Sequence, residues 1–346
     1  MSGSLLGKPQ RTQRYESREH RYENKKKRRK TQNTQRKNRL SRFSLFLSPC
    51  SLRLTLRSLW FIYKADRINM KNIYMPIPVR VKSIRNESDD KTLRTFDFEF
   101  VNEADAFDYM PGQFCQLSIP GEGEAPFGIA SSPTEKGFLR FTVNRVGVLT
   151  TALHYLREGD EIGIRGPLGN YYPVEEFRGK NVVIVSGGFA LTTLRSLMVY
   201  LRDPANRGDF GDITLIYGAR RPGLMIYRDE LEVWEKEDDV SIHLTIDQAV
   251  KGWDKMVGFV PTVTKEISPS STDAWVMLCG PPIMIKYTLP TLAGLGFPPE
   301  RIYTSLERRM KCGIGKCGRC NIGSKYICYD GPVFSFAQIE EIPEEI

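Results

Sequence analysis

The stretch NVVIVSGGFALTTLRSLMVYLRD, residues 181–203, decides the fold. Its first part is a short apolar run that ends at two glycines, and its second part is a longer segment in which leucines recur at helical spacing. The first pattern is typical of a strand buried in a parallel sheet, and the second of a helix that covers such a sheet. The stretch therefore predicts one strand–turn–helix unit of an α/β domain.

The same rhythm continues over residues 180–300, which we expect to form a parallel-sheet nucleotide-binding domain. The further segments are ITLIYGA at 213–219, RDELEVWEKE at 228–237, VSIHLTI at 240–246, AWVMLCG at 274–280 and PPIMIKYTLPTLAGLG at 281–296. Ligands of such sheets bind beyond the carboxyl ends of the strands. We therefore expect the glycines at 187–188, YGAR at 217–220 and CGPP at 279–282 to face one crevice.

Residues 76–176 show a different pattern, with short apolar or alternating runs separated by turn residues, which predicts an antiparallel Greek-key barrel. The runs are VRVKSI at 79–84, LRTFDFEF at 93–100, QFCQLSI at 113–119, FLRFTVNRV at 138–146 and EIGIRG at 161–166. One helix is expected in TTALHYLREGD at 150–160, with Thr150 or Thr151 as its N-cap and Gly159 closing its end.

The basic charge of the chain is confined to its leading segment. Residues 1–69 hold 19 of the 50 Lys and Arg but 4 of the 41 Asp and Glu, so the remainder is acidic. A nucleic-acid partner is therefore not expected for the folded part. Arg53 and Arg57 interrupt the apolar stretch at 43–63, so we expect no membrane span.

The segment 1–69 is expected to be disordered, because it is rich in Arg, Gln, Asn and Ser and has no regular apolar period before about position 43. Three interpretations stay open: an organellar transit peptide, a nucleic-acid arm, or translation begun upstream of the true start. The last is favoured, because Met70 and Met75 stand directly before the first strand pattern.

Four of the seven cysteines lie near the C-terminus in the spacing C-x4-C-x2-C-x7-C, namely Cys312, Cys317, Cys320 and Cys328. The first part is the run typical of plant-type 2Fe-2S ferredoxins, so residues 301–346 are predicted to bind a 2Fe-2S cluster. Gly313, Gly315, Gly318 and Gly323 would allow a tightly folded loop whose N–H groups point at sulfur. Structural zinc is the alternative, but such sites usually contain two C-x2-C pairs. A reducing cytoplasm fits the three scattered cysteines better than a disulfide framework.

The order of PFGIASSP at 126–133, FTVNRVGVLTTAL at 141–153 and GPLGNYYP at 166–173 resembles the flavin domain of the ferredoxin-NADP reductase superfamily. The resemblance implies FAD bound by one set of residues: Phe127, Gly128, Ile129, Ala130, Thr142, Val143, Asn144, Gly147, Leu149 and Thr150. A helix start independently attracts phosphate through its free N–H groups, which favours Gly147 and Thr150.

The chain departs from the superfamily in the flavin strand. Ala125 stands where an arginine commonly binds phosphate, Phe127 replaces tyrosine and Gly128 replaces serine. Neutralisation of the FAD phosphates must then come from elsewhere, for which Arg145 is a candidate.

The nucleotide domain resembles the superfamily in three strand ends, and this implies NAD(P) bound by Gly187, Gly188, Arg220, Cys279 and Gly280. Arg220 would meet a phosphate, and Cys279 would lie near the nicotinamide, unless it is simply a buried strand-end thiol. Ala190 and Thr193 replace the third glycine and the proline of the GGxGxxP pattern.

Over nearly all of 76–346 the chain is similar to the gamma subunit of soluble NAD(P)-linked nickel-iron hydrogenases, the sulfhydrogenases. The resemblance implies an enzyme subunit that passes electrons between NAD(P)H, FAD and the cluster, to or from a partner catalytic subunit. The corresponding subunit of anaerobic sulfite reductase and the electron-transfer subunit of dihydroorotate dehydrogenase are alternatives, although the latter usually has a longer gap before its fourth cysteine.

Two further interpretations stay open. The changes at Ala125, Gly128, Ala190 and Thr193 would also suit a non-enzymatic cysteine module for docking or redox sensing, and a self-sufficient flavin reductase is a third class. No catalytic side chain is predicted, because the cofactors perform the chemistry. Glu307 lies near the flavin or pairs with a neighbouring arginine, and His154 is expected to be structural.

Overall fold

The computed structural model describes residues 72–342. The chain divides into two compact units, Met1–Asn72 and Ile73–Ile346, and all the elements described below belong to the second. The predictions for residues 1–69 lie outside the described residues. Within 72–342, none of the helices has both the length and the apolar character needed to cross a membrane.

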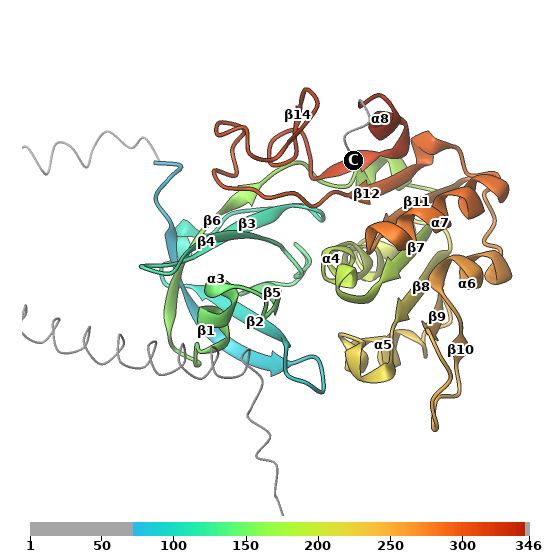
Figure 1. Ribbon diagram of the computed structural model, residues 1–346, viewed down its shortest axis with the longest axis horizontal. Helices are drawn as coiled ribbons and strands as arrows, with labels where there is room; N and C mark the ends of the chain where they lie inside the picture. The colour runs from blue at the N-terminus through green and yellow to red at the C-terminus, as the bar shows by residue number, and fades with distance from the viewer. Residues whose placement is uncertain (1–71, 343–346) are drawn as a thin grey trace, which may run out of the picture. The chain divides into compact units, whose positions relative to one another are not determined.

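The first part of the second unit is a six-stranded antiparallel sheet with the order β4-β3-β6-β1-β2-β5 (Figure 1). Its strands are β1 (Ile77–Asn86), β2 (Leu93–Phe100), β3 (Phe114–Ile119), β4 (Gly123–Gly128), β5 (Leu139–Asn144) and β6 (Glu161–Leu168). The predicted antiparallel fold is confirmed. The sheet curls until its edges meet, where the Ala130 N–H donates to the Arg140 carbonyl at 2.8 Å, but no strand ladder within the described residues closes the barrel.

The helix of the barrel, α3 (Val148–His154), begins earlier than predicted. Gly147 is its N-cap, and the Thr150 hydroxyl accepts the Gly147 N–H at 2.7 Å from the third helical position. Gly159 does not close the helix either. It takes a φ of 83° in the turn before β6, where its N–H donates to the Val81 carbonyl.

The second part is a mostly parallel sheet with the order β10-β9-β8-β7-β11-β12-β15. Its strands are β7 (Asn181–Gly187), β8 (Ile213–Ala219), β9 (Val240–Ile246), β10 (Met256–Val257), β11 (Ala274–Cys279), β12 (Ile302–Ser305) and β15 (Val333–Ser335). The predicted parallel sheet is confirmed, and β15 alone of these strands is antiparallel to its neighbour. The strand order reverses at β7, which lies between β8 and β11, and such a switch point is where open α/β sheets bind ligands.

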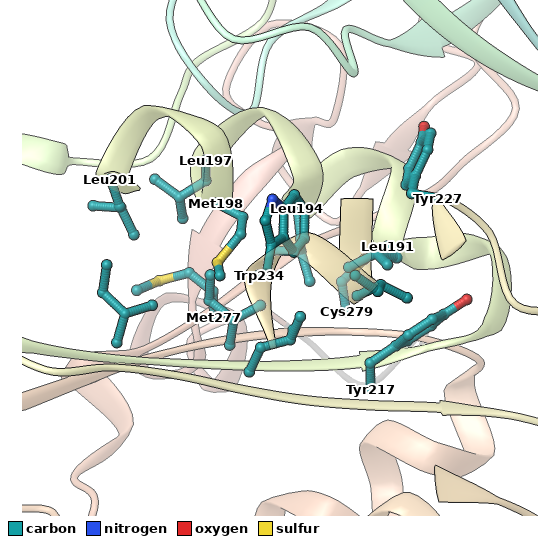
Figure 2. Close-up of a cluster of buried hydrophobic side chains, with 14 of the residues drawn as sticks. Leu191, Leu194, Leu197, Met198, Leu201, Tyr217, Tyr227, Trp234, Met277 and Cys279 are labelled. Atoms are coloured by element: carbon teal, nitrogen blue, oxygen red, sulfur yellow. The ribbon is translucent and has the colours of Figure 1, made fainter. Parts of the chain in front are cut away.

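Helices cover both faces of this sheet (Figure 1). The helices are α4 (Leu191–Arg202) and α5 (Arg228–Trp234) on one face, and α6 (Val260–Ile267) and α7 (Pro282–Gly294) on the other. Figure 2 shows the leucines of α4 packed against Trp234, Met277 and Cys279. This cluster also includes Leu93 and Ala130 from the barrel, so it crosses from one part to the other.

The C-terminal segment predicted at 301–346 contributes to the sheet as well as to the cysteine loop. Its strands β12 and β15 extend the parallel sheet beyond β11, so the sheet does not end at residue 300. The loop between them contains the hairpin β13 (Asn321–Ile322) and β14 (Lys325–Tyr326), and helix α8 (Phe336–Glu340) follows. The described residues also contain single-turn 3-10 helices at Glu103–Asp105, Val174–Phe177, Gly188–Ala190, Arg207–Asp209, Pro222–Leu224 and Pro299–Arg301.

Candidate functional site

The cysteine loop has the backbone that the sequence predicts. Gly313, Gly315, Gly318 and Gly323 all have positive φ, between 52° and 75°. The chain therefore folds back on Cys312, whose Sγ accepts the N–H groups of Ile314, Lys316 and Cys317 at 3.3–3.5 Å. Burial raises the pKa of this thiol, but these donors outweigh burial and hold the pKa at about 6. The loop thus presents N–H groups to a thiolate, as the prediction requires.

Two further cysteines of the loop, Cys320 and Cys328, also accept backbone hydrogen bonds at their sulfurs. The Gly315 N–H donates to Cys328 Sγ at 3.1 Å, and the Cys328 N–H donates to Cys320 Sγ at 3.5 Å. Cys320 and Cys328 are buried, while Cys317 is exposed. Burial and the neighbouring Cys320 raise the pKa of Cys328 to about 12.

As the side chains stand, no group of three or more His, Cys, Asp or Glu residues within 72–342 has the arrangement to hold a metal ion. The four thiols of the loop nevertheless interact pairwise, Cys312 with Cys317 and Cys328 with Cys320. An iron–sulfur cluster is larger than one ion and is held by thiolates whose sulfurs accept N–H bonds. The donor set and the N–H groups aimed at it fit such a cluster.

The cysteine loop packs against strands β3 and β6 of the barrel. A Cβ at Gly313 would lie 2.8 Å from Leu168 and 3.2 Å from Gln116 Nε2, so the backbone is in close contact with both strands. Arg165 on β6 donates to the Cys312 carbonyl at 3.1 Å and holds Glu124 through two bonds of 2.7 Å. These contacts place the cysteine loop against β3, the strand that pairs with β4.

Asn170 fastens the other end of the segment. Its side chain donates to the carbonyls of Asp330 and Val333 at 3.0 and 2.7 Å and accepts the Val333 N–H at 2.8 Å. The backbone N–H of Asn170 donates to the Gly331 carbonyl. Neither Asn170 nor Arg165 was predicted as a site residue, because their partners lie about 150 residues away along the chain.

The predicted flavin strand comprises the end of β4 and the residues directly after it, which contact helix α4 of the nucleotide domain. Phe127 is half-buried, and Ile129 and Ala130 are buried. Gly128 lies against Thr193 of α4, because a Cβ at Gly128 would approach the Thr193 methyl to 3.0 Å. The strand therefore meets the first turn of α4 at a position where a larger residue is crowded.

The predicted residues of β5 are placed differently from one another. The Thr142 hydroxyl bonds to the hydroxyls of Thr95 and Tyr227 at 2.7 and 2.6 Å, so its polar group is used in packing. Val143 is fully buried and its carbonyl accepts His154 Nε2 at 3.0 Å. Asn144 is half-buried at the end of the strand.

Two backbone N–H groups of the predicted phosphate-binding turn are already hydrogen-bonded within the turn. The Thr150 hydroxyl accepts the N–H groups of both Val146 and Gly147, so these two donors are not free as the prediction assumed. Leu149 points into the barrel core, while Val146 and Val148 are exposed. A phosphate contact at Gly147 and Thr150 stays a prediction, as does the compensating role of Arg145.

The nucleotide-domain glycines lie together at the switch point. A Cβ at Gly187 or Gly280 would collide with Met284, so the ends of β7 and β11 approach each other closely. Gly188 has a φ of 58° and open space beyond its Cα, and its carbonyl accepts the Tyr217 hydroxyl at 3.2 Å. Arg220 is exposed at the end of β8. The three strand ends thus occupy neighbouring strands, as the sequence predicts.

Cys279 lies where the two parts meet. Its thiol accepts a bond from the Thr193 hydroxyl at 3.5 Å and donates to the Ser305 carbonyl at 3.9 Å. Burial raises its pKa, and the charge of Glu307 contributes in the same direction, so Glu307 lies near this thiol. Since Thr193 also contacts Gly128, these residues form a continuous path from the flavin strand to the end of β11.

A buried ionic network joins the two parts and was not predicted. Arg195 on α4 pairs with Glu135 and Glu230 at 2.8 and 2.7 Å and donates to the Ala130 carbonyl at 2.7 Å. Arg140 on β5 also bonds to Glu230, at 2.9 Å. The flavin strand and the nucleotide-domain helix are therefore held in one fixed arrangement.

Comparison with known families finds three domain models that match successive parts of the chain. The chain matches the oxidoreductase FAD-binding domain over residues 78–172, the oxidoreductase NAD-binding domain over 184–289, and the iron-sulfur cluster binding domain of dihydroorotate dehydrogenase B over 307–340. The fold and the site thus define a flavin- and nicotinamide-dependent oxidoreductase of the ferredoxin-NADP reductase type with an added iron–sulfur segment.

Within that class, the chain belongs to the family of sulfhydrogenase gamma subunits and related electron-transfer subunits. It is 38% identical to sulfhydrogenase 1 subunit gamma of Pyrococcus furiosus, over 79% of this chain and 94% of the relative. It is 34% identical to a probable dihydroorotate dehydrogenase B electron transfer subunit of Methanocaldococcus jannaschii, over 75% and 89% of the two chains. The predicted identity as an oxidoreductase electron-transfer subunit is confirmed.

Solved structures share the fold. The structure of an NADH-dependent reduced ferredoxin-NADP oxidoreductase superposes with a TM-score of 0.59 at 27% identity, over 76% of this chain and 89% of the other. A ferredoxin NADP+ reductase from Neisseria gonorrhoeae gives a TM-score of 0.56 at 19% identity, over 66% and 96% of the two chains.

Proposed function

We propose that this chain is the subunit through which a larger oxidoreductase exchanges electrons with NAD(P)H, and that its partner is the catalytic subunit of a soluble nickel-iron hydrogenase. One observation supports this proposal: the cysteine loop packs against β3 and β6, and β3 is the direct neighbour of the flavin strand β4. The similarity to a sulfhydrogenase gamma subunit over most of both chains supports the partner.

Each part of the chain has a separate task in this proposal. Gly187, Gly188, Gly280 and Arg220 hold the dinucleotide at the switch point, and Cys279 lies beside its nicotinamide. Residues 127–130, at the end of β4 and directly after it, hold FAD together with the predicted residues of β5 and α3. The four cysteines hold a 2Fe-2S cluster.

Bound FAD would supply the exchange between the two-electron chemistry of the nicotinamide and the one-electron chemistry of the cluster. The protein supplies position, exclusion of water and control of potential. Gly128 and Thr193 bring the flavin strand and α4 into contact, and the fully buried core beneath them excludes water from the junction. The exposed Cys317 is the thiol nearest to solvent, and we propose that the partner docks on this side.

The electron-transfer subunit of dihydroorotate dehydrogenase remains a second candidate, favoured by the match of residues 307–340 to its cluster domain. The corresponding subunit of anaerobic sulfite reductase is a third candidate for the same kind of role. In all three cases we expect the chain to work in the cytoplasm with a catalytic partner. A non-enzymatic cysteine module that binds neither flavin nor iron is the candidate from a different functional class.

The test is anaerobic purification of the full chain from its native host, followed by analysis of its metals, flavin and bound proteins. The proposal predicts FAD, two irons and two sulfides per chain, bleaching by NADH or NADPH, and a co-purifying large subunit that contains nickel. A sirohaem protein or a dihydroorotate-oxidising flavoprotein in that place would assign the chain to an alternative. Colourless protein that contains zinc would refute the electron-transfer role.

A further inference from the structure

Gln116, in the middle of β3, has a buried side chain without a hydrogen-bond partner. Its exposed fraction is 0%, and neither Nε2 nor Oε1 has a partner among the described residues. An unpaired buried amide is destabilising, so a buried carboxamide in this position requires a specific explanation.

The strand register places Gln116 between the two predicted cofactor sites. On one side it pairs with Pro126 of β4, the residue directly before Phe127 of the flavin strand. On the other side it pairs with Arg165 of β6, which donates to the Cys312 carbonyl. The amide nitrogen lies against the cysteine loop, since a Cβ at Gly313 would be 3.2 Å from Nε2.

The face of β3 that carries Gln116 is the face on which the cysteine segment packs. Alternate residues of a strand share one face, so Phe114, Gln116 and Ser118 point to the same side. Phe114 belongs to the hydrophobic cluster that contains Cys320 and Cys328. The Ser118 hydroxyl is satisfied by the Gly163 carbonyl at 3.2 Å. Arg165 is engaged by Glu124 and by the loop, which leaves Gln116 as the uncommitted donor of this face within the described residues.

We propose that Gln116 is a positioning residue for the iron–sulfur cluster, with its Nε2–H group donating a hydrogen bond to a sulfur on the Cys312 side. This inference rests on the proposed function. A donor to sulfur stabilises the additional negative charge of the reduced state, so it raises the reduction potential. Gln116 would thereby favour electron flow from the flavin side toward the cluster. An amide suits this task because it donates a hydrogen bond without adding a charge to the interior.

The test compares the full wild-type chain with Gln116→Leu, Gln116→Glu and the control Ser118→Ala, all purified anaerobically. Ser118 lies two residues along the same strand on the same face, but its hydroxyl is already paired. Iron, acid-labile sulfide and FAD are measured first. The cluster is then titrated with the paramagnetic resonance signal of its reduced form as the readout.

We expect Gln116→Leu to lower the ratio of reduced to oxidised cluster about tenfold at the wild-type midpoint potential, which is a shift of about 59 mV for one electron. Gln116→Glu should lower the ratio further at a pH above the pKa of the new carboxyl, which burial raises, because only the ionised carboxylate adds negative charge and no donor. Ser118→Ala should leave the ratio unchanged.

An unchanged ratio and an unchanged resonance spectrum in the loaded Gln116→Leu variant would overturn the inference alone. If the leucine variant fails to fold or to retain iron, the nearly isosteric Gln116→Glu decides in its place by the same readout. Absence of iron and sulfide from the wild-type chain would overturn the proposed function, and this inference with it.

Discussion

Replacement of Arg195 by methionine removes the side chain that joins the nucleotide-domain helix α4 to the flavin strand. Arg195 is 2% exposed and bonds to Glu135, to Glu230 and to the Ala130 carbonyl. Methionine retains most of the apolar stem, so the packing loss is small and the lost interactions are electrostatic.

Removal of one partner from a buried ion pair costs about 3–5 kcal/mol, because the remaining charge stays uncompensated. The side chains of Glu135 and Glu230 retain 22% and 21% of their exposure, so water partly solvates them in the variant. We therefore expect Arg195→Met to lower the free energy of unfolding by about 3 kcal/mol, the lower end of this range, which raises the unfolding equilibrium constant roughly a hundredfold.

The assay is urea denaturation of the full chain at neutral pH, followed by far-ultraviolet circular dichroism. Arg202→Met is the matched control on the same helix, because Arg202 pairs with Glu237 within the nucleotide domain and is more exposed. Arg202→Met should lower the free energy of unfolding by about 1 kcal/mol. Adding Glu135→Gln to Arg195→Met should restore part of the stability, because Glu135 then carries no charge that Arg195 would have compensated, whereas Glu230 keeps its ion pair with Arg140.

A loss below about 1 kcal/mol for Arg195→Met, or a loss equal to that of Arg202→Met, would refute the reasoning. Failure of Glu135→Gln to restore any stability to Arg195→Met would show that the cost arises from packing and not from uncompensated charge.

Three other changes have expected outcomes. Asn170→Ala should cost about 2–3 kcal/mol, because three side-chain hydrogen bonds to the segment around Val333 are lost, and denaturation together with the rate of iron release should report it. Gly128→Ala should cost about 1 kcal/mol, because its Cβ would lie 3.0 Å from the Thr193 methyl, and Thr193→Ser, which lacks that methyl, should cancel this cost in a double-mutant cycle. Burial lowers the pKa of His154 from 6.5 to about 4, so the unfolded chain binds the additional proton, and the unfolding free energy should fall by up to about 3 kcal/mol between pH 6.5 and 4. His154→Leu should remove this part of the pH dependence.

Each of these measurements has its own control. Asn206→Ala loses one side-chain bond, to the Tyr200 carbonyl, and a loss as large as that of Asn170→Ala would contradict the anchoring role. Equal effects of Gly128→Ala with and without Thr193→Ser would mean that the two residues do not crowd each other. Parallel pH profiles for the wild-type chain and His154→Leu would exclude His154 as the titrating group.

The elements that the sequence predicted well are those set by local pattern. LRTFDFEF forms β2 with the predicted bounds, because alternating phenylalanines are typical of a strand, although the structure buries both faces from Thr95 to Phe98. The strand and helix of the opening stretch form β7 and α4. The four cysteines and the positive-φ glycines between them likewise follow from short-range spacing.

The elements that were not predicted depend on partners distant in the chain. β4 has the sequence GEAPFG, which has little strand propensity, so only the family resemblance and not the local pattern indicated it, and it forms because β3 offers it a ladder. The start of α3 moved to Gly147 because the Thr150 hydroxyl caps from inside the helix. The positions of Asn170 and Gln116 beside the cysteine segment had no local signal in the sequence.

The sequence alone determined the class of each domain, the order of the cofactor motifs and the four thiols, because these depend on the periodicity and spacing of nearby residues. The tertiary structure alone decided what lies between the motifs: the seat of the cysteine loop on Arg165 and Gln116, the path from Gly128 to Cys279, and the network of Arg195. The physical reason is that burial and hydrogen bonding between segments 60 to 160 residues apart depend on strand register and domain packing, which no local pattern encodes.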